Sequence, residues 1–204
     1  MPPDGRRPCA YHEARRRHSG GRDEDEDEDE DDELTPLDDL PFFADQALEW
    51  DADELGRRGP LLLFALQGPP LRDLVMLQWA FGLELGDAMW ASDTCAGIEA
   101  RKTYPNVDVL AAELMLGHGS STDLPRVEAA IGLLTSLIGR ADDAHRPAPL
   151  CMLAWLEWAR GRGSFAGAHL DEVRAIAPEY SMGQLLDAFF NTGTLPEWIF
   201  TRPE

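Results

Sequence analysis

The strongest constraint on the fold of this chain is a short segment that is apolar on nearly every side. Residues 150–159 have the sequence LCMLAWLEWA, in which only Glu157 carries a charge. In a helix these side chains point in all directions, so the segment has almost no polar face to turn toward water. A single helical hairpin around it would bury too little surface to be stable alone. The segment therefore predicts the centre of a larger helical core.

Proline and glycine residues divide the region around this segment into three helices. Pro149 begins the first helix, Gly161 and Gly163 form the turn to the second, and Pro178 ends the second. Apolar residues at i, i+3, i+4 and i+7 mark a third helix: Met182, Leu185, Leu186 and Phe189. The spacing resembles the tetratricopeptide repeat, in which a proline closes the second of two paired helices.

The same punctuation predicts the helices upstream of this trio. They span residues 42–55, 71–89, 107–116 and 124–138. Gly59-Pro60 is predicted to end the first of them, and residues 92–105 are predicted to form a loop with one turn at most. The apolar run 61–66 is too short to classify by its period, so a helical turn is preferred and a buried strand is the rival.

These patterns predict an all-α fold, an irregular helical array that ends in a tetratricopeptide-like hairpin plus one helix. Only one repeat copy is present, and such units normally stack in threes. Other helices must supply the missing cover, so we expect residues 71–140 to pack on the trio 149–192 within a single domain, residues 41–204. An apolar tail after the trio is expected to fold back onto it: Leu195, Trp198 and Phe200.

The net charge of −20 is distributed unevenly along the chain. Residues 1–22 carry six arginines, whereas Asp23–Glu33 is an unbroken acidic run. Such a run repels itself and cannot build a core, so residues 1–40 are predicted to be a disordered tail. The alternatives for this tail are a solvated segment with no specific role, an interaction tail, or an acidic strip that imitates DNA. The acidic body disfavours nucleic acid and anionic membranes as partners of the folded part.

The cysteines and the apolar runs point to a cytoplasmic protein. Cys9, Cys95 and Cys151 form no CxxC pair, so neither a zinc knuckle nor a disulfide framework is predicted. No apolar stretch approaches the roughly 18 residues of a membrane span. The N-terminus has arginines but no apolar segment after them, so it does not resemble a secretory signal.

No catalytic, cofactor-binding or metal-binding residues are predicted. The histidines are scattered and form no metal-binding pair, and the nucleotide-binding glycine patterns are absent. The sequence Gly117-His118-Gly119-Ser120-Ser121 lacks the serine position of a nucleophile elbow and is interpreted as a flexible loop. If the loop were catalytic, His118 would be the base and Ser120 or Ser121 the nucleophile.

Two further groups of side chains allow a binding and a structural interpretation. One is an aromatic set, which forms either a ligand pocket or, as we prefer, part of the core: Trp155, Trp158 and Trp198. The other is acidic, and it lines either a hairpin groove or, as we prefer, a solvated face: Glu157, Asp171 and Glu172.

Four stretches of the C-terminal part resemble one protein family. They are APLCMLAWLEWARGRG at 148–163, SFAG at 164–167, AIAPEYS at 175–181 and LPEW at 195–198. They are similar to the C-terminal part of the bacterial family called domain of unknown function 4192. The resemblance covers about 60 residues, fades across 71–147, and implies a divergent or N-terminally truncated member. The family has no assigned activity, so the resemblance implies no catalytic residues.

The leading functional hypothesis is a non-catalytic helical module that binds a protein partner and needs no cofactor. Helical grooves of the tetratricopeptide kind bind peptides or other helices. The alternative is an enzyme or enzyme fragment that uses the loop of His118 and Ser120. The sequence identifies neither the partner nor the oligomeric state.

Overall fold

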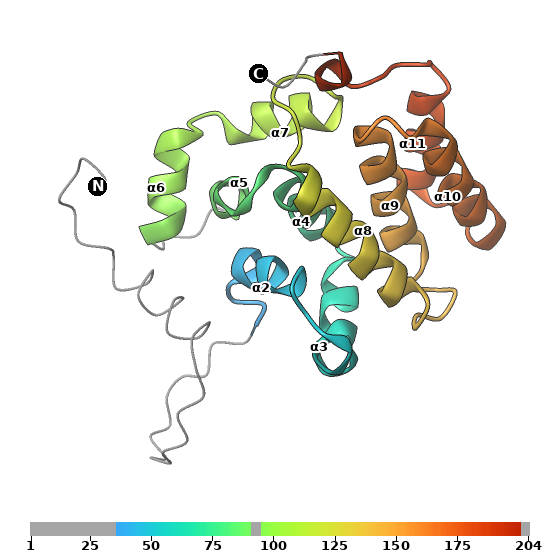
Figure 1. Cartoon of the computed structure of the whole chain (residues 1–204), viewed down its shortest axis with the longest axis horizontal. Coiled ribbons are helices and arrows are strands. Elements are labelled where there is room, and N and C mark those ends of the chain that lie inside the picture. Colours follow the sequence, from blue (N-terminus) through green and yellow to red (C-terminus); the bar gives the residue numbers. More distant parts are fainter. Residues whose placement is uncertain (1–35, 91–94, 201–204) are drawn as a thin grey trace.

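The computed structural model describes residues 36–90 and 95–200, and within them every regular element is a helix (Figure 1). The all-α prediction is therefore confirmed, and the predicted tail lies almost wholly outside the described residues. The elements are α2 (Leu40–Ala47), α3 (Ala52–Ala65), α4 (Pro69–Phe81), α5 (Leu83–Met89), α6 (Cys95–Thr103), α7 (Val107–Met115), α8 (Leu124–Ile138), α9 (Pro147–Ala159), α10 (Gly163–Ile176), α11 (Ser181–Phe190) and the 3-10 turn η1 (Glu197–Ile199). None of the described helices is long and apolar enough to cross a membrane.

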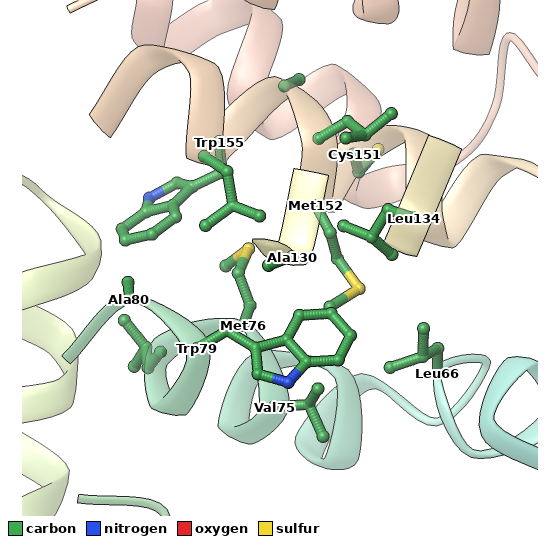
Figure 2. Packing of buried hydrophobic residues seen from close by; sticks show 14 of the residues in the cluster. Leu66, Val75, Met76, Trp79, Ala80, Ala130, Leu134, Cys151, Met152 and Trp155 are labelled. Carbon is green, nitrogen blue, oxygen red and sulfur yellow. The ribbon is translucent and has the colours of Figure 1, made fainter. Parts of the chain in front are cut away.

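Helix α9 contains the apolar segment and is buried along its whole length. Helices α4 and α8 contact it on one side, and α10 and α11 contact it on the other (Figure 1). Figure 2 shows Met76 and Trp79 of α4 pointing toward Met152 of α9, with Leu134 of α8 beside them. The covering that a helix without a polar face requires thus comes from neighbours on several sides.

Capping residues begin several helices where the sequence places them. Asp123 Oδ1 accepts the backbone N–H of Arg126 at 3.2 Å, which starts α8. The prolines of the Gly68-Pro69-Pro70 break occupy the first turn of α4, where a missing N–H costs no hydrogen bond. In the trio, α9 begins at Pro147, two residues before the predicted Pro149. Helix α10 begins at Gly163, the second glycine of the predicted turn, and α11 begins at Ser181, one residue before Met182.

The predicted helix 42–55 is wrong, because two helices occupy this region. Helix α2 ends at Ala47, and Asp51 Oδ1 then accepts the N–H groups of Asp53 and Glu54, both at 2.9 Å, to start α3. Nor does Gly59-Pro60 end a helix. Pro60 lies inside α3 on its exposed side, so water can hydrate the carbonyl that loses its partner. Residues 61–65 of the apolar run lie in α3 and Leu66 is its C-cap, so the helical alternative is confirmed.

Two other boundaries differ from prediction. Residues 71–89 form two helices, because Gly82 adopts φ +109°, a left-handed value that interrupts the hydrogen-bond ladder between α4 and α5. The predicted loop 92–105 contains helix α6, which packs against α5. Its contact with a neighbour supplies the stability that its weak apolar pattern does not predict.

Candidate functional site

The loop with His118 is held in place by the end of the chain. Nδ1 of His118 lies 2.9 Å from Oε1 of Glu197, and the Gly119 N–H donates to Oε2 of the same carboxylate at 3.3 Å. The Glu197 N–H in turn donates to the Gly117 carbonyl at 2.8 Å. The hydrogen bond from His118 lowers the pKa of Glu197 most, and the hydrogen bond from the Gly119 N–H lowers it further.

This geometry does not assemble a nucleophile with a base. His118 and Glu197 are both exposed, and the ring nitrogen that makes a hydrogen bond contacts the carboxylate rather than Ser120 or Ser121. Both serines are themselves exposed. Glu197 lies 79 residues from His118, so no local pattern in the sequence links the two. We call residues 194–199 the C-terminal strap. The loop therefore serves to hold this strap in place through hydrogen bonds to Glu197.

The three tryptophans form part of the core. Their indole N–H groups donate to backbone carbonyls: Trp155 to Met115 at 3.0 Å, Trp158 to Thr194 at 2.9 Å, and Trp198 to Ala159 at 2.8 Å. Trp198 also meets the ring of Phe81 edge-on, with centroids 5.6 Å apart. Because each polar N–H is paired and each ring is covered, these residues stabilise the fold and tie the strap to α9.

The three acidic residues do not form one group. Glu157 is buried and accepts two hydrogen bonds from Arg160, both at 2.8 Å, so its assignment to a solvated face is wrong. Asp171 is exposed and pairs with Arg174, which also reaches Asp187 of α11 at 2.8 Å. Glu172 pairs with Arg146, the residue that precedes α9.

A small hollow lies between α10 and α11. Its lining combines apolar side chains with a polar rim: Leu170, Val173, Arg174, Ala177, Pro178, Tyr180, Gly183, Gln184 and Asp187. A volume of ≈ 50 Å³ is open to atoms the size of a water molecule. Since one water needs roughly 10–15 Å³, the hollow has room for a small aliphatic side chain.

Glycine makes the close contact beneath this hollow possible. A Cβ added at Gly183 would lie 2.8 Å from Cγ1 of Val173 and 3.8 Å from Sγ of Cys151. The absence of a side chain thus lets α11 approach α10 over the buried thiol. Burial raises the pKa of Cys151 to about 12, so the thiol stays protonated and unreactive in the folded protein.

A buried arginine fixes the turn at one side of the hollow. Arg72 of α4 donates from Nη1 to the Tyr180 hydroxyl at 3.0 Å and from Nε to Oδ1 of Asp73 at 2.9 Å. Burial alone would lower the pKa of Arg72, but Asp73 and Tyr180 raise it overall, so the guanidinium remains charged. Sequence reasoning missed this residue, because Arg72 resembles an ordinary surface arginine near a helix start.

Within residues 36–90 and 95–200, no group of three or more His, Cys, Asp or Glu side chains could hold a metal ion. No curated protein and no solved structure matches the chain. One family matches, described as Domain of unknown function (DUF4192), and the match runs from residue 10 to residue 197. It extends well beyond the C-terminal stretches that carry the resemblance and includes all of the described α-helices. The chain therefore belongs to the family Domain of unknown function (DUF4192).

Proposed function

We propose that the chain is a non-catalytic helical module that binds a partner protein, and that the hollow between α10 and α11 receives an apolar side chain of that partner. The observation that supports this proposal is the combination of an apolar floor with a charged rim. Leu170 and Val173 provide the floor, and Arg174 and Asp187 provide the rim. Binding energy at protein interfaces concentrates where an anchor residue fills such a pocket.

The fixed shape of the hollow also favours binding. Arg174 of α10 donates from Nη2 to Oδ1 of Asp187 in α11 at 2.8 Å, and Gln184 of α11 donates from Nε2 to the Pro178 carbonyl at 3.0 Å. The two walls are therefore joined by hydrogen bonds before a partner arrives, which reduces the entropy lost on association. We further propose that the module is cytoplasmic, acts as one domain over residues 41–204, and does not bind nucleic acid through its acidic folded part.

The test is to fill the hollow with a bulky side chain. Ala177→Trp places an indole where the partner's side chain would lie, and Ala188→Trp adds the same group to the exposed face of α11 outside the hollow. The full-length chain and both variants capture proteins from native lysate. A genuine partner binds Ala177→Trp roughly 30-fold more weakly than it binds the wild type. The same partner binds Ala188→Trp as tightly as it binds the wild type. If every captured protein survives Ala177→Trp, the hollow is not the binding site.

The alternative function is an enzyme or enzyme fragment that uses the loop of His118 and Ser120. The His118–Glu197 contact is the observation that bears on it, because a carboxylate commonly orients the imidazole of a general base. In cells that lack the protein, the variants His118→Ala and Ser120→Ala should restore the phenotype as well as the wild type does. Loss of rescue by both variants would favour the enzyme.

A further inference from the structure

The outer face of α7 carries an apolar stripe that no described helix covers. Val109 and Ala112 of α7 and Leu116, its C-cap, recur at i, i+3 and i+7 and are all exposed, Val109 by 60% and Leu116 by 48%. Residues with this spacing share one side of a helix and extend over roughly 10 Å. An exposed apolar stripe of this kind costs solvation free energy until something packs against it.

Two carboxylates flank this stripe, one on each side. On the helical wheel Glu113 lies on one side of it and Asp108 on the other. Both are exposed, and within the described part of the chain neither forms an ion pair. Helix α7 contains no lysine or arginine. The face therefore suits a segment that has an apolar stripe between positive charges.

The N-terminal part of this chain has that pattern in its sequence. Residues 10–18 read AYHEARRRH, and at a helical period the apolar side chains of Tyr11 and Ala14 share one side with the polar His18, at i, i+3 and i+7. Arg15 lies on one side of this stripe and Arg17 on the other. The acidic run 23–33 can also attract arginines, but it has no apolar side chain to pack against Tyr11.

We propose that residues 10–18 of the same chain dock on the outer face of α7, with Tyr11 and Ala14 against Val109 and Leu116 and the arginines beside Asp108 and Glu113. Two observations support this occupant over a separate protein. The family match begins at residue 10, so the family pattern includes this segment. The face is also within reach, because α2 and α7 both contact α5.

The length of the connection supports the same conclusion. Seventeen residues, 19–35, separate the segment 10–18 from the described chain, and an extended chain spans up to about 3.5 Å per residue, or roughly 60 Å here. Helix α5 contacts both α2 and α7, and packed helix axes lie about 8–10 Å apart. The axes of α2, where the described chain begins, and of α7 are therefore at most roughly 20 Å apart. This docking is independent of the hollow between α10 and α11, so either proposal can fail without the other.

Disulfide trapping tests the docking in the full-length chain, because Cys9 lies directly before the segment. In a Cys95→Ser background, Ala112→Cys places a thiol in the stripe and Ala188→Cys places one on an exposed alanine of α11. Both positions are within reach of Cys9. Mild oxidation followed by peptide mass spectrometry gives the rate of each intramolecular disulfide. We expect the Cys9 disulfide to form at least about tenfold faster with Ala112→Cys than with Ala188→Cys, since docking raises the local concentration of Cys9 beside α7.

Charge reversal supplies the second arm. Arg15→Glu together with Arg17→Glu should reduce the rate for Ala112→Cys to that of the Ala188→Cys control, and high salt should slow it in the same direction. Equal rates for the two cysteine positions would overturn the proposal, as would a fast rate that charge reversal leaves unchanged. Disulfides that form only between molecules would assign the face to a second copy of the chain and would also overturn it.

Discussion

A buried glutamine and a glycine that touch in the core allow a quantitative test of the packing. Gln78 of α4 is fully buried and donates from Nε2 to the Pro41 carbonyl at 2.7 Å. Its Oε1 has no hydrogen-bond partner among the described residues and lies against Gly86 of α5, where an added Cβ would sit only 2.0 Å away. Gly86→Ala therefore forces the amide of Gln78 to move.

The cost of this change follows from its parts. Overpacking costs about 1–3 kcal/mol. If the amide swings away from Pro41, the buried carbonyl loses its donor, at a further cost of about 1–3 kcal/mol. Alanine is favoured over glycine inside a helix by up to about 1 kcal/mol, which offsets part of the loss. We expect Gly86→Ala to lower the free energy of unfolding by about 1–5 kcal/mol.

A double-mutant cycle isolates the contact. Gln78→Ala removes the clashing amide, so Gly86→Ala should cost at least about 1 kcal/mol less in that background than in the wild type. Urea denaturation followed by circular dichroism measures all four proteins. Gly132→Ala in α8 is the matched control, because a Cβ there meets nothing within 4 Å and should be neutral or stabilising. If the effects of the two changes add within about 0.5 kcal/mol, the contact between Gln78 and Gly86 is refuted.

Three further predictions concern the strap and the buried thiol. Trp198→Ala should lower the free energy of unfolding by about 3–5 kcal/mol in urea denaturation, whereas Leu195→Ala, at an exposed position, should cost less than about 1 kcal/mol; similar losses for both would contradict the packing. Cys151, with a pKa of about 12, should resist alkylation at pH 8 until urea unfolds the chain, and rapid labelling of the native protein would contradict its burial. Because the pKa of Glu197 is lowered in the fold, its contribution to stability is present above the ordinary glutamate value of 4.5 and is lost as the pH falls. Glu197→Gln should therefore make stability fall less steeply with acid than in the wild type, and parallel pH profiles would exclude this contribution.

The sequence predicts the C-terminal half of the fold better than the N-terminal half, for reasons that particular residues make clear. In α8, α10 and α11 an apolar stripe is bounded by a strong signal, such as the cap Asp123 or the terminator Pro178. Gly82 carries no comparable sequence signal for a helix end. It falls in phase with the stripe of residues 71–89, and only its positive φ shows that the helix breaks there. Pro60 misleads in the opposite direction, because its cost is small on an exposed helix face.

The side chains around the candidate site depend on contacts that the sequence does not encode locally. Arg72 meets Tyr180 across 108 residues, and Glu197 meets His118 across 79. Each residue taken alone resembles a surface charge or a surface hydroxyl. Their roles follow from the packing of α4 and η1 around α9, and this packing is decided by the whole core rather than by any motif.

The strap also determines the order in which the protein can finish folding. Trp198 follows Ala159, its hydrogen-bond acceptor, by 39 residues, and at a synthesis rate of about 5–20 residues per second it emerges from the ribosome roughly 2–8 s later. During that interval Phe81 lacks its contact with Trp198, and Trp158 lacks its hydrogen bond to Thr194. A nascent chain thus exposes an aggregation-prone aromatic surface for seconds. We expect a ribosome pause between α9 and η1 to lengthen this exposure, so slow codons at residues 160–198 should lower the yield of folded protein.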